Sequence, residues 1–151
     1  MLTMEEIADK PMINKVLCVD DDSLSLTISE LMLNSASFSE QIDTAMDGMD
    51  ALAYLDTIWE SAEKDQKAPQ LILLDINMPV MNGWEFLEKF VPAYQEKFPN
   101  TKIIILSSTI DPEDFAMAKR FPVVIDFFSK PLEVDSLEAL KVSDHFKTFF
   151  G

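Results

Sequence analysis

Short apolar runs alternate with stretches of helical spacing along this chain, and that alternation limits the possible folds more than any other feature. The five runs begin near Lys15, Gln41, Leu71, Lys102 and Val123. Repeated strand and helix steps favour right-handed crossovers, which build a parallel sheet with helices on both faces. Residues 103–106 are apolar at every position, as expected for a strand buried on both sides. We therefore predict an α/β fold with a doubly wound, five-stranded parallel sheet.

Side chains able to do chemistry follow four of these runs. They are Asp20 and Asp21 after the first run, Asp75 after the third, Ser107 and Ser108 after the fourth, and Lys130 after the fifth. Open α/β sheets place their sites at the carboxyl ends of the strands, so these groups should gather on one edge. Carboxylates, a hydroxyl and an ammonium group together suit phosphoryl transfer assisted by a divalent cation.

The acidic residues of this edge call for a cation. Two ionised carboxylates about 4 Å apart repel by roughly 4 kcal/mol at an effective dielectric near 20. Clustering Asp20, Asp21 and Asp75 is therefore costly unless a cation shares the space. Mg²⁺ is the natural occupant, because it is hard, prefers oxygen ligands and commonly uses one or two carboxylates together with phosphate oxygens. A carboxylate beside it can then attack a phosphoryl group and form an aspartyl phosphate.

Composition excludes several other classes of function. A formal net charge of -15 would repel nucleic acid and anionic lipid, so we expect no binding to either. No apolar run approaches the roughly 20 residues that cross a bilayer, and the N-terminus carries acids where a secretion signal carries lysine or arginine, so we expect a cytoplasmic protein. Cys18 lies in a predicted buried strand, and the lone histidine, His145, is expected to have a surface or packing role.

The motifs resemble the receiver domain of two-component response regulators. They are Val19-Asp20-Asp21, Leu74-Asp75-Ile76-Asn77-Met78-Pro79 with Asn82-Gly83, Leu106-Ser107, and Ser129-Lys130-Pro131. Each is weak alone, but together they stand in the family's order and at compatible spacing. The resemblance covers about residues 14 to 150 and implies a flavodoxin-like (βα)5 fold with strand order 2-1-3-4-5. Residues 1–13 are expected to be a mobile lead-in, and residues 14–151 the receiver domain.

The resemblance also implies roles for individual residues. Asp75 would be the phosphoacceptor; Asp21 and Asp75 would bind Mg²⁺ directly, and Asp20 mainly through metal-bound water. The backbone carbonyl of Asn77 would complete the protein ligands. The family's switch hydroxyl corresponds to Ser107, its conserved-type lysine to Lys130, and its aromatic switch position to Phe127, where phenylalanine stands in place of the frequent tyrosine. A cis bond between Lys130 and Pro131 is usual in the family.

A signalling function follows from these roles. We expect Asp75 to accept a phosphoryl group from a sensor histidine kinase or a histidine phosphotransfer protein, without catalysis on any other substrate. The signal would leave by contact with a downstream protein, through the helix that starts after Asp111, the strand from Val123 and the helix from Val134 to about Phe149. A monomer or a phosphorylation-dependent dimer is expected.

Two alternatives share parts of this pattern. An aspartate-nucleophile phosphohydrolase of the haloacid-dehalogenase type would use Asp20, with Asp22 as the second acid and one residue between the two. Against it, no acidic pair closes a later strand beyond Lys130, and the chain lacks room for the usual cap domain. A flavodoxin-like flavin carrier would need its first loop to cradle a phosphate, which the aspartates there would repel.

Local signals predict the helices. The first helix should be capped by Asp22 or Ser23 and should turn Leu24, Ile28, Leu31 and Met32 inward. Ser61 to Ala68 is polar and predicts a surface connection. Pro92 falls inside the third helix and predicts a kink or a break there. Asp111 and Pro112 predict a strong helix start, and residues 134–149 predict one final helix.

Overall fold

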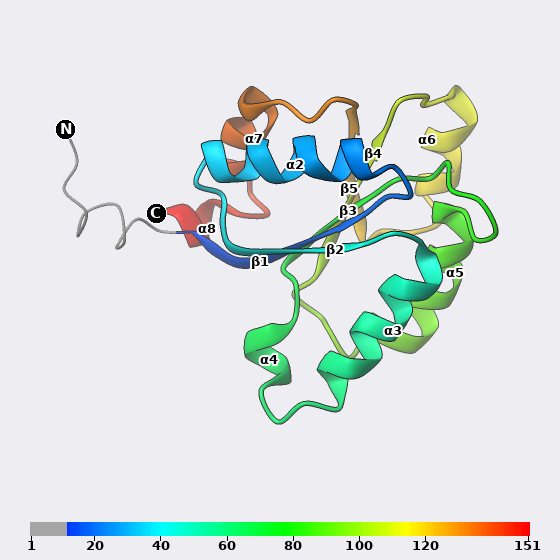
Figure 1. Cartoon of the computed structure of the whole chain (residues 1–151), viewed down its shortest axis with the longest axis horizontal. Coiled ribbons are helices and arrows are strands. Elements are labelled where there is room, and N and C mark those ends of the chain that lie inside the picture. Colours follow the sequence, from blue (N-terminus) through cyan, green and yellow to red (C-terminus); the bar gives the residue numbers. More distant parts are fainter. Residues whose placement is uncertain (1–11) are drawn as a thin grey trace.

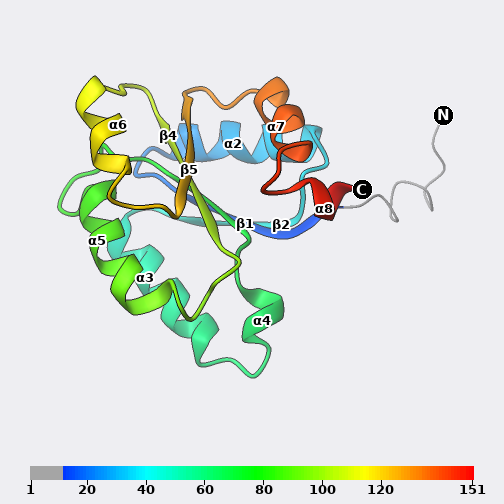
Figure 2. The same cartoon turned by 180° about the vertical axis from the view of Figure 1, so that it is seen from behind.

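The computed structural model describes residues 12–151, and within them the strands form a single parallel sheet in the order β2-β1-β3-β4-β5 (Figures 1 and 2). The strands are β1 Ile13–Val19, β2 Ser39–Ala45, β3 Leu71–Leu74, β4 Lys102–Ser107 and β5 Val124–Ser129. The predicted fold class and strand order are confirmed. The first strand begins at Ile13, within the predicted lead-in, and the rest of that prediction falls on residues 1–11, outside the described part of the chain.

Helices cover both faces of the sheet, as predicted (Figure 1). They are α2 Ser23–Ser35, α3 Gly48–Trp59, α4 Lys64–Lys67, α5 Gly83–Tyr94, α6 Pro112–Ala118, α7 Val134–Lys141 and α8 Lys147–Phe150. Helices α2 and α7 pack on one face, and α3 and α5 pack on the other. Alternate strand residues divide between the two cores: Leu17 and Ile72 face α3 and α5, whereas Cys18 and Leu73 face α2 and α7. No helix in the described residues is both long enough and apolar enough to span a bilayer.

The predicted inward face of the first helix is wrong. Leu24 and Leu31 are 65% and 56% exposed, and Ile28 and Met32 are only partly buried. The buried residues of α2 are instead Leu26, Ser29 and Leu33. Apolar residues lie on two sides of this helix, so periodicity alone could not choose between them. The Asp22 carboxylate accepts a hydrogen bond from the Leu24 backbone N–H and caps the helix, as predicted.

The other expectations about the helices have different outcomes. The Ser61–Ala68 connection lies at the surface, as predicted, and contains the single-turn helix α4. The predicted break at Pro92 is wrong, because helix α5 runs through it; Pro92 and Glu88, four residues before it, are both exposed. The final helix ends at Lys141 and resumes as α8. The Ser143 hydroxyl donates to the Leu140 carbonyl at 2.7 Å, which competes with helical pairing and turns the chain.

Candidate functional site

Backbone pairing brings the ends of four strands together at one edge of the sheet. The Asp75 N–H donates to the Val19 carbonyl, and the Lys130 N–H donates to the Ser107 carbonyl, both at 3.0 Å. Val19 is in register with Leu74, and Leu74 with Ile105. The residues that follow these strands are therefore neighbours in space, although they are far apart in the sequence. Asp20, Asp21, Asp75, Ser107 and Lys130 all lie at this edge, where the sequence placed them.

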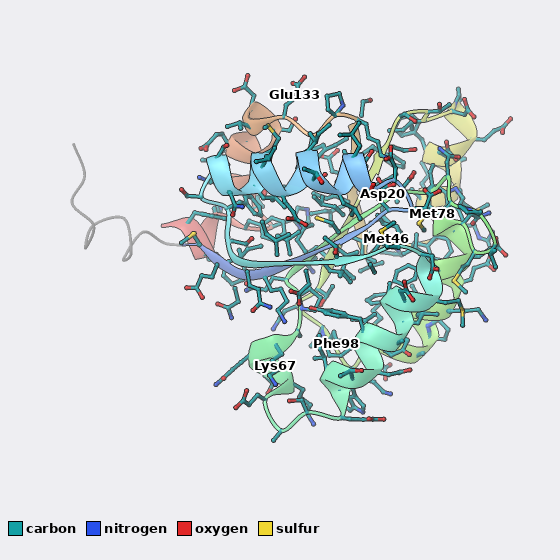
Figure 3. The ribbon with its side chains drawn as sticks, in the orientation of Figure 1. Asp20, Met46, Lys67, Met78, Phe98 and Glu133 are labelled. Carbon is teal, nitrogen blue, oxygen red and sulfur yellow. The ribbon has the colours of Figure 1, made fainter. Side chains whose placement is uncertain are left out.

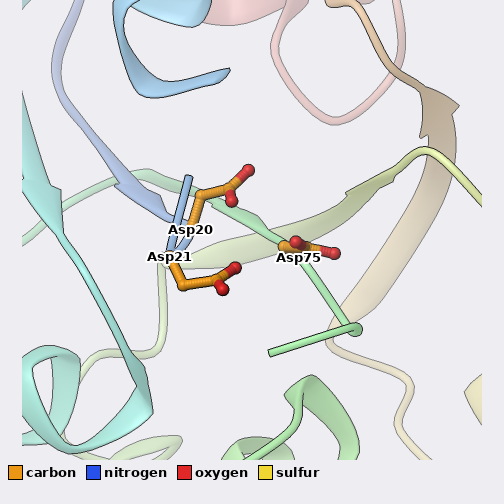
Figure 4. A group of neighbouring side chains, drawn as sticks. All are labelled: Asp20, Asp21 and Asp75. Atoms are coloured by element: carbon orange, nitrogen blue, oxygen red, sulfur yellow. The ribbon is translucent and has the colours of Figure 1, made fainter. Parts of the chain in front are cut away.

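Three carboxylates form an acidic pocket there, made of Asp20, Asp21 and Asp75. Each residue offers one oxygen, and these oxygens lie within 4.8 Å of one another. Figure 4 shows Asp20 and Asp21 leaving the loop after β1 and Asp75 leaving the end of β3. Asp20 and Asp75 are each only 5% exposed, whereas Asp21 is exposed to solvent. The pocket is therefore closed on one side and open on the side of Asp21.

Lys130 supplies the positive charge that faces this pocket. Its Nζ lies 2.6 Å from Asp20 Oδ2 and 3.2 Å from Asp75 Oδ2. Burial opposes ionisation of the lysine, but the hydrogen bond to Asp20 and the charges of Asp75 and Asp20 outweigh it and raise the pKa of Lys130. Burial raises the pKa of Asp20, and the hydrogen bonds from Lys130 and from the Asp22 backbone offset that effect only in part. One ammonium group thus faces three carboxylates.

The hydroxyl of Ser107 connects the pocket to the next loop. Ser107 is fully buried, and its Oγ donates to Asp75 Oδ1 at 3.1 Å. The same Oγ accepts a hydrogen bond from Asn77 Nδ2 at 2.8 Å, and that amide also donates to the Thr109 carbonyl at 3.3 Å. Sequence reasoning assigned Asn77 only a backbone role and missed this side-chain bridge. The only sequence feature that could have indicated this contact was the position of Asn77, two residues after Asp75.

Phe127 lies beside this network on β5. Its ring is half-buried and tilted by 51° against the ring of Phe115, with 4.6 Å between the ring centroids. Phe115 belongs to α6 and is 51% exposed. Phe127, which corresponds to the family's aromatic switch position, therefore packs against Phe115, a residue that the sequence analysis did not identify. Together they join β5 to α6 by an apolar contact.

Gly83 allows α5 to begin directly against the end of β3. A Cβ at this position would lie 2.7 Å from the Ile76 Cα and 2.9 Å from the Asp75 carbonyl oxygen, closer than real contacts allow. The helix is held there by a capping box, in which Asn82 Oδ1 accepts from the Glu85 N–H and Glu85 Oε1 accepts from the Asn82 N–H. Glycine therefore fixes the loop that carries Asp75 and Asn77.

The donor atoms of the pocket fit a hard divalent cation. All are carboxylate oxygens, and three carboxylates against one ammonium group leave two negative charges without a partner. Asp75 Oδ1 also accepts from the Asn77 N–H at 3.0 Å, which fixes the direction of its carboxylate. Asp22 is not part of this set and acts as the cap of α2. The peptide bond between Lys130 and Pro131 is cis, as the resemblance implies.

Comparison with protein families matches residues 16–141 to the family described as the response regulator receiver domain. Among curated proteins, the chain is 33% identical over 130 residues to a protein-glutamate methylesterase/protein-glutamine glutaminase of Halalkalibacterium halodurans, which covers 86% of this chain and 34% of that protein. It is 32% identical over 123 residues to the transcriptional regulatory protein CitT of the same organism, covering 82% of this chain and 48% of that protein. The chain therefore spans about a third to a half of the length of these two curated relatives.

Solved structures agree with this result. A two-component response regulator from Cytophaga hutchinsonii superposes with a TM-score of 0.77 at 30% identity, covering 85% of this chain and 94% of that one. The chemotaxis protein CheY4 of Vibrio cholerae gives a TM-score of 0.67 at 27% identity, covering 85% and 95%. Because the family that matches most of the chain is the response regulator receiver domain, the phosphohydrolase alternative that used Asp20 as nucleophile is wrong.

Proposed function

Because the chain belongs to the family of response regulator receiver domains, we propose that Asp75 is its phosphoacceptor and that Mg²⁺ binds beside it. The observation that carries this proposal is the convergence of Asp20, Asp21 and Asp75 on one small space with a single lysine. The general function of this family is two-component signalling, and the described fold is consistent with it. The assignment of the reacting oxygen to Asp75 rests on its central position between Lys130 and Ser107.

Each side chain contributes a defined part of the reaction. Asp75 Oδ2 attacks the phosphorus, the bond from phosphorus to the donor nitrogen breaks, and the electron pair leaves with the histidine imidazole. Asp21, Asp75 and the Asn77 carbonyl would hold Mg²⁺, with Asp20 acting mainly through metal-bound water, and the ion would neutralise negative charge on the phosphoryl oxygens. Lys130 Nζ then moves from Asp75 Oδ2 to a phosphoryl oxygen and forms a charge-assisted hydrogen bond. The Ser107 hydroxyl, now 3.1 Å from Asp75 Oδ1, donates to a second phosphoryl oxygen.

The signal would pass from Ser107 to the outer surface. When Ser107 turns toward the phosphoryl group, its hydrogen bond from Asn77 Nδ2 is lost and the β4–α6 loop can shift. Phe127 and Phe115 move with that loop because their rings are in contact. The face made of α6, β5 and α7 would then bind a downstream protein. Moving such an equilibrium from about 1:99 to 99:1 requires roughly 5.5 kcal/mol of differential stabilisation.

The phosphoryl donor is proposed to be a sensor histidine kinase or a histidine phosphotransfer protein. Leu24, which is exposed in the first turn of α2 next to the loop that carries Asp20 and Asp21, offers an apolar surface for such a protein. We propose that the chain reacts only with its own phosphoryl donors and catalyses no reaction on a separate substrate. A cytoplasmic location and a monomer, or a dimer formed on phosphorylation, complete the proposal.

Incubation with acetyl phosphate and Mg²⁺ tests the assignment. Intact-mass spectrometry should detect one added phosphate in the wild-type protein and none in Asp75→Asn or after removal of Mg²⁺ by EDTA. Asp126→Asn is the matched control, because Asp126 is an exposed aspartate on β5 outside the pocket, and it should be phosphorylated like the wild type. The same phosphorylated product in Asp75→Asn would refute the assignment.

A further inference from the structure

Val80 is exposed and conformationally strained at the mouth of the acidic pocket. Its side chain is 96% exposed, and its backbone adopts φ 67, in the left-handed region. A β-branched residue rarely occupies this region, and such strain costs of the order of 1–3 kcal/mol. Neither burial nor backbone preference explains a valine at this position. The residue lies in the β3–α5 loop, shortly after Asp75 and beside Pro79.

Two exposed methionines lie beside Val80, although they come from a different part of the chain. Met46 is 44% exposed and Met49 is 58% exposed, at the start of α3. Met46, Met49 and Val80 line one surface hollow of about 260 Å³ together with Asp21 and Asp47. Figure 3 shows Met46 close to Asp20 at the same edge of the sheet. We call Met46, Met49 and Val80 the methionine rim.

The packing beneath the rim holds its two halves together. Met81 is 7% exposed and packs against Gly48 at the first turn of α3. A Cβ on Gly48 would lie 2.6 Å from the Met81 sulfur, so the Met81 side chain would have to shift if the glycine were replaced. This close contact places the β3–α5 loop directly against the first turn of α3. Val80, the neighbour of Met81, therefore lies beside Met46 and Met49.

We propose that the methionine rim is a docking surface for the protein that carries the phosphohistidine, an inference that rests on the proposed function. Asp21 belongs both to the acidic pocket and to the wall of the rim hollow, so the two are continuous. A histidine on another protein cannot bring its phosphorus to Asp75 unless the surface around that histidine covers this mouth. A small donor such as acetyl phosphate can enter without touching the rim.

The chemistry of the rim describes the partner surface. Exposed methionines adapt their shape to an apolar surface, because the unbranched thioether side chain is flexible and polarisable. Asp21 and Asp47 line the same hollow as the rim. The partner should therefore present apolar side chains around its phosphohistidine, with lysine or arginine side chains at their margin. A protein donor would make these contacts with the rim, whereas a small donor such as acetyl phosphate would make none of them.

Val80→Asn separates docking from folding. Asparagine adopts positive φ more readily than valine, so the variant should be at least as stable as the wild type in urea unfolding. Removal of the apolar side chain should lower the rate of phosphotransfer from a protein donor about tenfold. The probe is the autophosphorylated sensor kinase from the host organism that phosphorylates the wild-type chain fastest. Phosphorylation by acetyl phosphate should be unchanged, since the acidic pocket is intact.

Met49→Gln keeps the length of the side chain and should lower transfer from the kinase in the same direction. Val142→Asn is the matched control, because Val142 is 77% exposed at the end of α7, away from the pocket. Equal transfer from the kinase to the wild type and to Val80→Asn would overturn the docking proposal. Equal losses with the kinase and with acetyl phosphate would also overturn it, because the effect would then lie in the pocket.

The outcomes separate docking from the proposed function. If the wild-type chain accepts no phosphate from acetyl phosphate, the proposed function fails and the rim is not the cause. If the wild type is a dimer in sedimentation and Val80→Asn is a monomer, a second copy of this chain occupies the rim, which overturns the proposal. Kinase-specific loss in Val80→Asn, with a stable fold and normal acetyl phosphate reactivity, supports it.

Discussion

Two lysines with little exposed side chain, Lys15 and Lys130, lie near opposite ends of β1, and their surroundings differ in charge balance. Lys15, near the start of the strand, is 8% exposed and lies 3.4 Å from Asp43 Oδ2. Asp43 also accepts hydrogen bonds from the Tyr54 hydroxyl at 2.7 Å and from Gln41 Nε2 at 2.9 Å. Lys130, beyond the other end, is 15% exposed and faces both Asp20 and Asp75, with Asp21 nearby.

The difference between the two clusters separates a structural ion pair from a functional one. At Lys15 one positive charge meets one negative charge, and the remaining polar atoms of Asp43 have partners. Lys130 contacts two carboxylates of a cluster of three, which leaves an excess of negative charge that no described protein group balances. Buried charge is tolerated only when it is paired. The unbalanced cluster is therefore the one prepared for a cation and a phosphoryl group.

Removing the acid of the balanced cluster should have the largest effect on stability. Asp43→Asn leaves the buried Lys15 without a counter-charge, so the free energy of unfolding should fall by about 3 kcal/mol. Urea unfolding measures this change. Glu40→Gln, at an exposed acid on the same strand, is the control and should change stability by less than about 0.5 kcal/mol. An Asp43→Asn protein as stable as the control would show that Lys15 is not held by this pair.

Replacing each lysine by methionine should separate the clusters by their response to Mg²⁺. In Lys130→Met, Asp20 and Asp75 lose their counter-charge, so the protein should lose about 2 kcal/mol of stability without Mg²⁺. Added Mg²⁺ should restore more stability to this variant than it adds to the wild type. In Lys15→Met, Mg²⁺ should raise the free energy of unfolding only as much as it does in the wild type. Equal increments in the two variants, measured by urea unfolding with and without Mg²⁺, would contradict the charge argument.

The two clusters should also respond to acid with opposite signs. Burial raises the pKa of Asp43, but the hydrogen bonds from Tyr54 and Gln41 and the charge of Lys15 outweigh it and leave the pKa below its usual value. Its contribution to stability is thus present above about pH 4 and is lost as the pH falls through the lowered pKa. The stability difference between wild type and Asp43→Asn should shrink at acid pH. A difference that grows as the pH falls would be inconsistent with this sign.

Asp20 provides the opposite case. Burial raises its pKa despite the hydrogen bond from Lys130, so its ionised form costs folding free energy at neutral pH. That cost is relieved as the pH falls through the raised pKa. The stability of Asp20→Asn relative to the wild type should therefore be higher at pH 7 than at acid pH, and it should fall as the pH drops through the raised pKa. Unfolding curves of both proteins across this range measure the effect.

The functional edge could be predicted from the sequence because the carboxyl ends of all strands in a parallel sheet lie at the same edge. The apolar runs fixed the strands, and the polar residue after each run fixed its position at the edge, so Asp20, Asp75, Ser107 and Lys130 needed no knowledge of side-chain packing. Motif order then supplied the family. The roles of these residues in phosphoryl transfer remain proposals that the experiments above address.

Side-chain packing was the part that sequence could not supply. Helix α2 carries apolar residues on two sides, and only the contact with the sheet selects Leu26 and Leu33 over Leu24 and Leu31. The partnership of Lys15, Asp43 and Tyr54 depends on three separate elements, β1, β2 and α3, and none of these residues forms a recognisable motif. The strained φ of Val80 leaves no signal in the sequence, because valine is not typical of that conformation.

The free energy of unfolding of wild type and Asp21→Asn, each with and without Mg²⁺, tests the central claim most directly. Asp21 is the exposed member of the acidic pocket, so its neutralisation removes repulsion without breaking the contacts of Lys130. Without Mg²⁺, Asp21→Asn should be more stable than the wild type by about 1 kcal/mol. With Mg²⁺ at about 100 times its dissociation constant, the wild type should gain roughly 2.7 kcal/mol and become the more stable protein. The same Mg²⁺ increment in both proteins, or a less stable Asp21→Asn in its absence, would contradict the account.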